Sequence, residues 1–199
     1  MNWKKCLALL LAAVLTLALA ACGPATNEAT TPSESNAPSE GSTPGESTGD
    51  ETAPAAGSKH VENLVVGITG SVGKTSTKEF IAAVLAEKYK VHKTAGNYNN
   101  EVGLPLTIFG IQDDDQIAVL EMGINTFGEM HRLSEVARPD ICVMTNIGQC
   151  HLENLIDRDG ILRAKSEIFD FMNPEGTVIV NGDDDKLATI HDVYGKAPI

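Results

Sequence analysis

A glycine-rich segment, Gly70-Ser71-Val72-Gly73-Lys74-Thr75, separates an apolar run typical of a buried strand (64–69) from a segment of helical period that begins at Lys74. Glycines let successive backbone N–H groups curl around a phosphate, and the N-terminus of the helix adds positive potential. In such a loop Lys74 neutralises the outer phosphates of a nucleotide and the Thr75 hydroxyl can hold magnesium. The segment therefore predicts a phosphate loop for ATP, with these candidate contacts: Gly70, Ser71, Gly73, Lys74, Thr75 and Ser76.

The spacing of the loop departs from the common pattern by one residue. That pattern puts four residues between the first glycine and the Gly-Lys pair, whereas Gly67 and Gly73 enclose five. A tight turn with an incidental lysine is the alternative interpretation. The phosphate loop is favoured because a strand and a helix flank the segment where the binding mechanism needs them.

Three further side chains could hold a metal ion. Glu121 ends the apolar run 117–122, where burying an unpaired carboxylate would be costly, so a nearby cation is expected; a solvated strand end is the alternative. His151 follows the apolar run 141–147, although a lone histidine is more often structural. Cys150 suggests a thiol site, but magnesium prefers oxygen, and the spacing to Cys142 does not suit zinc.

The remaining candidates have ordinary alternatives. Lys165 lies in a segment of helical period, where a lysine usually pairs with an acid at the surface. Asn97, Asn99 and Asn100 are either turn residues or donors to a phosphate or peptide, and the sequence does not decide between them. Other polar residues are interpreted as solvated surface: His131, His191, Asp113-Asp114-Asp115 and Asp183-Asp184-Asp185.

Short apolar runs that alternate with helical segments predict an α/β fold, a mostly parallel sheet with helices on both faces. Ligands of such sheets gather at the carboxyl ends of the strands, where each candidate falls. The first helix is expected to bury Phe80, Ile81, Val84 and Leu85 on one face. The expected strands are 64–69, 90–94, 117–122, 141–147 and 177–180, and the expected helices are 74–88, 104–109, 128–136 and 160–171.

Seven segments, in order, resemble the Mur ligase family and its P-loop central ATP-binding domain. Within the family, the stretch from Thr94 to Thr107 most resembles the member that joins D-alanyl-D-alanine to UDP-N-acetylmuramoyl-tripeptide. The segments are Thr69 to Thr75, Thr94 to Asn100, Glu121-Met122-Gly123, Thr145 to Gly148, His151-Leu152-Glu153, Ala164 to Phe169 and Asn181 to Asp184.

The resemblance implies a role for each candidate. Thr75 and Glu121 would hold one magnesium ion, while His151 and a lysine carbamylated by carbon dioxide, Lys165, would hold a second. Lys74, His151 and Lys165 would be catalytic. Asn146 and Asn181 would lie beside the nucleotide, and Asn97, Asn99 and Asn100 would contact the substrate.

The implied activity is ATP-dependent amide ligation in peptidoglycan precursor synthesis, through an acyl phosphate. The alternatives are an exported nucleotide-binding fragment without ligase activity, a surface lipoprotein that reuses the fold for interaction, and another Mur-family ligase. Family members carry further domains on both sides of the central one, so 59–199 is expected to be a partial, apparently truncated, central domain.

The amino-terminal part of the chain differs in composition. Two lysines and a 16-residue apolar run up to Ala21 predict a lipoprotein signal peptide (1–21), followed by Cys22 as the lipidation site. Residues 22–58 are rich in Ser, Thr, Pro and Glu and are expected to form a disordered spacer. Without Lys4 and Lys5 the chain has 13 basic and 27 acidic residues, a net charge of −14, which disfavours nucleic-acid binding. The expected location is the membrane, through a lipid anchor, or the cytoplasm if the signal is an artefact of the gene assignment.

We expect processing and lipidation at Cys22, because it follows Leu19-Ala20-Ala21 and opens the spacer. Mass spectrometry of the mature amino terminus should find a lipid-modified Cys22. An unmodified Met1 terminus on a soluble product would rule out export.

Overall fold

The computed structural model describes residues 63–199. The predicted signal peptide, Cys22, the spacer and residues 59–62 lie outside the described residues. Within 63–199, no helix is both long and apolar enough to cross a membrane.

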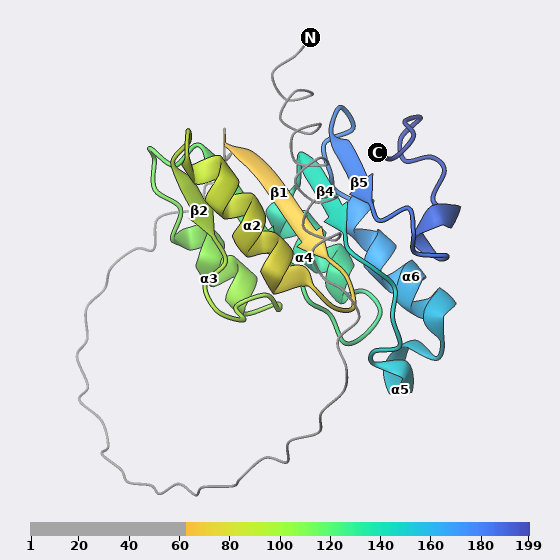
Figure 1. Ribbon diagram of the computed structural model, residues 1–199. Helices are drawn as coiled ribbons and strands as arrows, with labels where there is room; N and C mark the ends of the chain where they lie inside the picture. The colour runs from red at the N-terminus through yellow and green to blue at the C-terminus, as the bar shows by residue number, and fades with distance from the viewer. Residues whose placement is uncertain (1–62) are drawn as a thin grey trace, which may run out of the picture.

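The described residues form a five-stranded parallel sheet in the order β2-β3-β1-β4-β5, which confirms the predicted sheet (Figure 1). Val66 of the central strand is aligned with Val119 of β3 on one side and with Ile141 of β4 on the other. This register brings the carboxyl ends of neighbouring strands to one edge. The strands are β1 (Leu64–Thr69), β2 (Val91–Lys93), β3 (Ile117–Glu121), β4 (Ile141–Met144) and β5 (Thr177–Val180).

Helices cover both faces of the sheet, as predicted. α2 packs against β1, β2 and β3 on one face, while α3, α4 and α6 share a core on the other (Figure 1). The helices are α2 (Lys74–Ala86), α3 (Gly103–Phe109), α4 (Glu129–Ala137), α5 (Leu152–Leu155) and α6 (Arg158–Ser166), with 3-10 turns η1 (Glu167–Phe169) and η2 (Leu187–Thr189).

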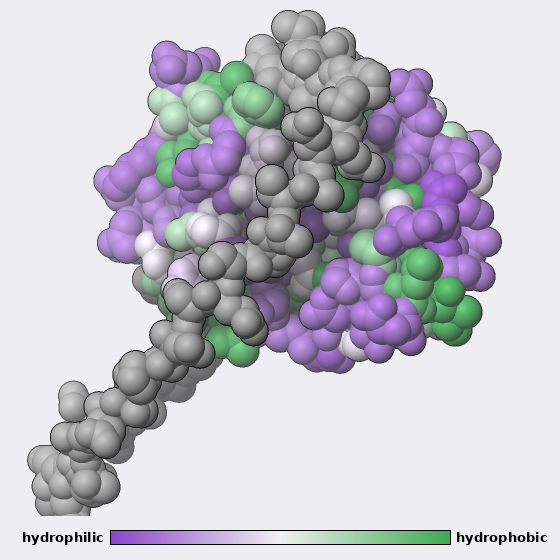
Figure 2. Space-filling view, turned by 60° about the horizontal axis from the view of Figure 1, so that its bottom comes forward, coloured by the Kyte–Doolittle hydropathy of each residue, from purple (hydrophilic) through white to green (hydrophobic). Residues whose placement is uncertain are grey.

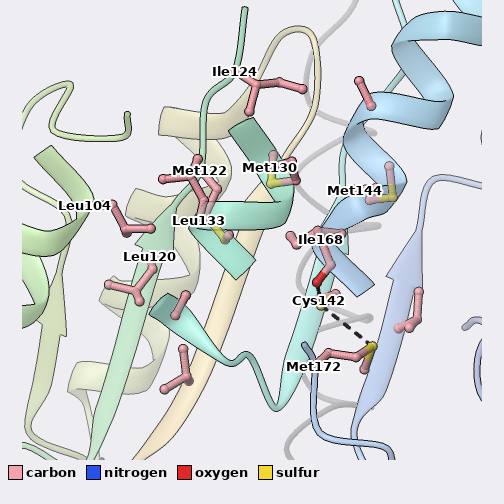
Figure 3. Packing of buried hydrophobic residues seen from close by; sticks show 14 of the residues in the cluster. Leu104, Leu120, Met122, Ile124, Met130, Leu133, Cys142, Met144, Ile168 and Met172 are labelled. Carbon is pink, nitrogen blue, oxygen red and sulfur yellow. Dashed lines mark hydrogen bonds between the residues drawn. The ribbon is translucent and has the colours of Figure 1, made fainter. Parts of the chain in front are cut away.

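Alternate strand residues supply the two cores, as the period of two requires. Val66 and Val119 face α2, whereas Val65 and Leu120 face the other helices. Figure 3 shows this second core, where Leu104 from α3 and Leu133 from α4 approach β3. The Cys142 thiol lies 3.8 Å from the Ile168 carbonyl and 3.9 Å from the Met172 sulfur, and burial raises the pKa of this thiol.

The buried face of α2 differs from the predicted one. Phe80 and Val84 are exposed, at 52% and 36% of their surface, whereas Ile81 and Leu85 are buried as expected. The stripe of α2 that faces the sheet is displaced by one residue from the predicted stripe. In addition to Ile81 and Leu85, it contains Thr77, Lys78 and Ala82. An apolar pattern alone predicted the wrong stripe because a buried lysine occupies part of it.

Two surface assignments were also wrong. Asp115 is buried, and its carboxylate accepts a hydrogen bond from the Gln112 amide at 2.8 Å. Asp184 accepts the Ile147 amide at 2.8 Å and the Leu187 amide at 2.9 Å, and so links the end of β4 to η2. Each acid caps a turn, which is how Asp115 becomes buried and Asp184 partly buried within acidic runs. His131 and His191 are exposed as predicted.

The predicted helix 160–171 begins earlier and is divided. The Asp157 carboxylate caps α6 by accepting the Gly160 amide at 2.7 Å, so the helix starts at Arg158. A Cβ at Gly160 would lie 1.9 Å from the Leu155 carbonyl oxygen, which explains the glycine in the first turn of α6, where this helix approaches the end of α5. The preceding short helix, α5, was not predicted.

Figure 2 brings the lower edge of Figure 1 toward the viewer, the edge to which the arrowheads of β1 and β4 point. Hydrophilic residues cover most of the visible described surface, and hydrophobic ones gather in separate patches. The carboxyl edge of the sheet is therefore largely polar.

We expect Ile81→Ala to lower the free energy of unfolding by about 2–5 kcal/mol, because it removes a side chain buried between α2 and the sheet. Its neighbour provides the matched control: Phe80→Ala should change stability by no more than about 0.5 kcal/mol. Urea unfolding measures the stability of both variants. A larger loss of stability for Phe80→Ala than for Ile81→Ala would contradict the assignment of Ile81 to the buried face of α2.

Candidate active site

The crevice at the carboxyl edge follows from the strand order. β1 and β4 are neighbours, but the chain after β1 crosses toward β2 and the chain after β4 crosses toward β5. The two connections leave in opposite directions, so a gap opens between them, which is where ligands of open α/β sheets bind. The predicted phosphate loop and His151 lie in these two connections.

The phosphate loop is a tight turn between β1 and α2. Gly70 has φ 148°, and a Cβ there would lie 1.9 Å from the Thr145 hydroxyl, so only glycine fits. Gly73 is left-handed, with φ 81°, and directs the chain into α2. Gly67, which made the spacing irregular, lies within β1 and is not a loop glycine. The Lys74 amine donates to the Gly70 carbonyl at 2.9 Å, so it lies across the loop.

The end of β4 holds the loop in shape. The Asn146 side-chain oxygen accepts the amides of Ser71 at 3.2 Å and Val72 at 3.0 Å. The Thr145 hydroxyl donates to the Val72 carbonyl at 2.7 Å. The Ser71 hydroxyl accepts the Gly148 amide at 2.9 Å. Asn146, assigned to the nucleotide by resemblance, thus acts on the loop itself.

A buried carboxylate lies beside the first turn of α2. Glu121 is 2% exposed, and one of its oxygens accepts hydrogen bonds from the Thr75 hydroxyl at 3.2 Å and from the Asn99 amide group at 2.9 Å. The other oxygen has no hydrogen bond among residues 63–199, and the Lys78 amine is 3.7 Å away. The alternative of a solvated strand end is excluded, since this carboxylate is buried.

The three asparagines occupy different positions. Asn99 contacts Glu121, and its carbonyl accepts the Gly123 amide at 2.7 Å. Asn100 accepts the Gly103 amide at 2.8 Å through its side chain and so supports the start of α3. Asn97 is exposed at the mouth of the cavity. The turn role suits Asn100, while Asn97 and Asn99 line the cavity, and the Asn99 amide group donates to Glu121.

Lys165 of α6 is 2% exposed, which excludes the alternative of an ordinary surface lysine. Burial, followed by the charge of Lys74, lowers the pKa of its amine to about 8, and Cys150 partly opposes this shift. No hydrogen bond or ion pair links this amine to another described residue. His151 has a left-handed backbone, with φ 54°, a conformation in which histidine is found more often than most residues.

A cavity of about 210 Å³ brings most of the candidates together. Thr75 and Glu121 do not line the cavity, but Glu121 bonds to Asn99, which does. Gly73 and the exposed Ser76, at the start of α2, do not line it either. Asn181 does not line it either, because its side chain accepts the Asp183 amide within its own turn. The cavity is lined by Gly70, Ser71, Lys74, Asn97, Asn99, Asn100, Gly123, Ile124, Asn125, Cys150, His151 and Lys165.

The donor set fits magnesium better than a metal that needs several protein ligands. No group of three or more His, Cys, Asp or Glu side chains in 63–199 is arranged to hold a metal ion. Magnesium needs few protein ligands, because it usually keeps waters and takes one or two carboxylates together with phosphate oxygens. The free oxygen of Glu121, next to the Thr75 hydroxyl and the phosphate loop, provides this kind of partial site.

Two residues of the site were missed or discounted. Lys78 is 1% exposed and donates to the Thr94 carbonyl at 2.8 Å. Its position, four residues after Lys74 and three before Ile81, was a signal that it lies on the buried stripe. Cys150 was discounted as a metal ligand, yet its thiol lines the cavity, 3.2 Å from the Ser71 hydroxyl.

Comparison with known proteins supports the resemblance. The Mur ligase middle domain family matches residues 68–198. UDP-N-acetylmuramoyl-tripeptide–D-alanyl-D-alanine ligase of Bacillus subtilis is 47% identical over 132 residues, which are 66% of this chain and 29% of that enzyme. The Escherichia coli enzyme of the same name is 36% identical over 141 residues, 71% of this chain and 31% of its own length.

Solved structures give the same result. A crystal structure of MurF from Acinetobacter baumannii is 38% identical, with a TM-score of 0.64, and covers 67% of this chain and 30% of its own. MurF of Thermotoga maritima, solved in complex with ADP, is 40% identical, with a TM-score of 0.60, and covers 63% and 30%. This chain therefore spans less than a third of the length of these relatives. The matched segment and the shared fold establish that the chain belongs to the Mur ligase middle domain family.

Proposed function

We propose that residues 63–199 form the ATP- and magnesium-binding part of a ligase that adds D-alanyl-D-alanine to UDP-N-acetylmuramoyl-tripeptide. The observation that carries the proposal is the buried Glu121 carboxylate, which keeps one oxygen free of hydrogen bonds beside Thr75 and the phosphate loop. The named relatives support the choice of substrates. Because the chain spans 29% of the B. subtilis enzyme, the complete reaction would require the remaining domains.

The side chains would act mainly by position and charge. Lys74 would face the phosphate that passes from ATP to the tripeptide carboxylate, and the amides at the start of α2 would offset the negative charge that develops there. Magnesium, when bound by Thr75 and Glu121, would supply further positive charge at the same phosphates. Asn97 and Asn99 would orient the substrate at the far side of the cavity.

The finer proposal concerns the carbamate of Lys165. The amine would attack carbon dioxide and release a proton, which leaves an anionic carbamate in place of a cation. This step needs the neutral amine, and burial lowers the pKa of Lys165 to about 8, so this form is more abundant near neutral pH than in an ordinary lysine. The carbamate oxygens and His151 would then hold a second magnesium ion.

The alternative of a nucleotide-binding module without ligation keeps the same ATP site. The two proposals differ in what happens when the missing family domains are added. A ligase would then form an acyl phosphate from ATP and UDP-N-acetylmuramoyl-tripeptide, whereas a nucleotide-binding module would not. The export and lipid anchor at Cys22 stay a separate proposal, tested by the mature amino terminus.

We expect Lys74→Ala to weaken binding of ATP with magnesium by at least about tenfold, because a hydrogen bond to a charged group contributes about 1.5–3 kcal/mol. Asp114→Ala is the control, since Asp114 pairs with Lys90 before the start of β3, at the opposite edge of the sheet. Calorimetry measures both affinities. Equal affinities for the wild type and Lys74→Ala would remove the phosphate-loop assignment.

We expect ¹³C-bicarbonate to give a carbamate carbon signal in the NMR spectrum that is absent from Lys165→Ala. The signal should strengthen as pH rises through about 8, because the neutral amine becomes the major form above the pKa of Lys165. Lys88→Ala, which removes an exposed lysine, should keep the signal. A wild-type spectrum without carbamate at saturating bicarbonate would return Lys165 to a structural role.

A further inference from the structure

Lys78 is a buried cation that the proposed function does not use. It lies on α2 one turn after Thr75, and its side chain is 1% exposed. Removing an ammonium group from water is costly, and the cost is offset only when hydrogen bonds and opposite charges surround the group. The partners of Lys78 therefore identify what the residue organises.

The amine of Lys78 joins α2 to the chain that follows β2. It donates to the Thr94 carbonyl at 2.8 Å and reaches the Gly96 carbonyl at 3.5 Å. α2 packs directly against β2 and β3, so this contact bridges two elements that lie side by side (Figure 1). The bridged segment leads immediately into Asn97 and Asn99, which line the cavity.

Thr94 is held at three atoms, one of which is the carbonyl bound by Lys78. Its amide donates to the Val119 carbonyl at 3.1 Å, and its hydroxyl accepts the Glu121 amide at 2.9 Å. Thr94 is fully buried. Helix α2, the end of β2 and the end of β3 thus meet at one residue, and the Lys78 amine provides the link to α2.

The same amine faces the free oxygen of Glu121 at 3.7 Å. A second acid, Glu79, lies 3.2 Å from the amine but is about half exposed, so its charge is shared with water. The Glu121 oxygen is buried and unpaired by hydrogen bonds within the described residues, so Lys78 provides the nearest positive charge that the structure gives it. The ammonium thus balances the carboxylate and fixes the loop that supplies Asn99 to its other oxygen.

We propose that Lys78 is a positioning residue of the site, which ties the phosphate-loop helix to the asparagine loop (97–100) and so sets the geometry of Glu121 toward a divalent cation. The part that concerns the cation rests on the proposed function. The part that concerns the loop does not, because the contacts with Thr94 and Gly96 involve only this chain.

The first test is hydrogen exchange of the full chain without nucleotide or metal. In Lys78→Met the amides of Tyr98, Asn99 and Gly123 should exchange at least about tenfold faster, because the loop that holds them loses its link to α2. Core amides of β1 should be unchanged. Glu79→Gln, which alters the exposed acid beside the same amine, should exchange like the wild type.

The second test separates positioning from general loss of structure. In the presence of EDTA, the affinity of Lys78→Met for ATP should lie within about threefold of that of the wild type, because Lys74 is intact. The gain in ATP affinity on adding magnesium should fall at least about tenfold in this variant, since metal ligands tolerate little displacement. A general loss of structure would lower both affinities. A magnesium gain equal to or larger than that of the wild type would overturn the proposal.

Lys78→Met removes the counter-charge of the buried Glu121, and the chain could fail to fold for this reason alone. A double variant keeps the test decisive in that case. Lys78→Met combined with Glu121→Gln has no buried charge at this place, and its loop amides should still exchange faster than those of Glu121→Gln alone. Equal exchange in the two would overturn the role of Lys78. If Glu121→Gln alone kept the full magnesium gain, the proposed metal site would fail while the loop result stood.

Discussion

The fold buries the Glu121 carboxylate, whose removal from water costs free energy, and the site is organised around this charge. Glu121 ends β3 and, by the alternation of that strand, faces α2 together with Ile117 and Val119. A carboxylate at such a position requires donors or cations. Thr75, Lys78 and Asn99 meet this requirement from two different elements. The position of α2 relative to the loop after β2 therefore depends on polar contacts as well as on apolar packing.

Much of the architecture could be predicted because it depends on local pattern. The five strands read as short apolar runs, and parallel pairing brings their carboxyl ends together without any knowledge of side-chain contacts. For this reason the phosphate loop, the asparagine loop, Glu121 and His151 were found as candidates. Each follows or ends a strand, and the roles of His151 and the asparagines rested in addition on the resemblance to the Mur ligase family.

Features that depend on packing could not be predicted in the same way. Phe80 and Val84 are as apolar as Ile81, and only the sheet beneath α2 decides which of them is buried. The spacing of Lys78 from Ile81 places it on the buried stripe of α2, but its partner, the Thr94 carbonyl after β2, is known only from the structure. Asn181 has the same residue type as the cavity asparagines, but it caps its own turn. Such choices depend on tertiary contacts rather than on residue type.

The edge of the sheet also explains why two lysines from opposite faces act on one cavity. Lys74 begins α2 on one face, whereas Lys165 lies in α6 on the other, and only beyond the strand ends can both reach the same space. Their mutual repulsion lowers the pKa of Lys165, in addition to the larger effect of burial. Burial favours the neutral amine of Lys165, because removal from water penalises its charged form. The same arrangement of two lysines at one cavity thus favours the neutral amine that the proposed carbamate of Lys165 requires.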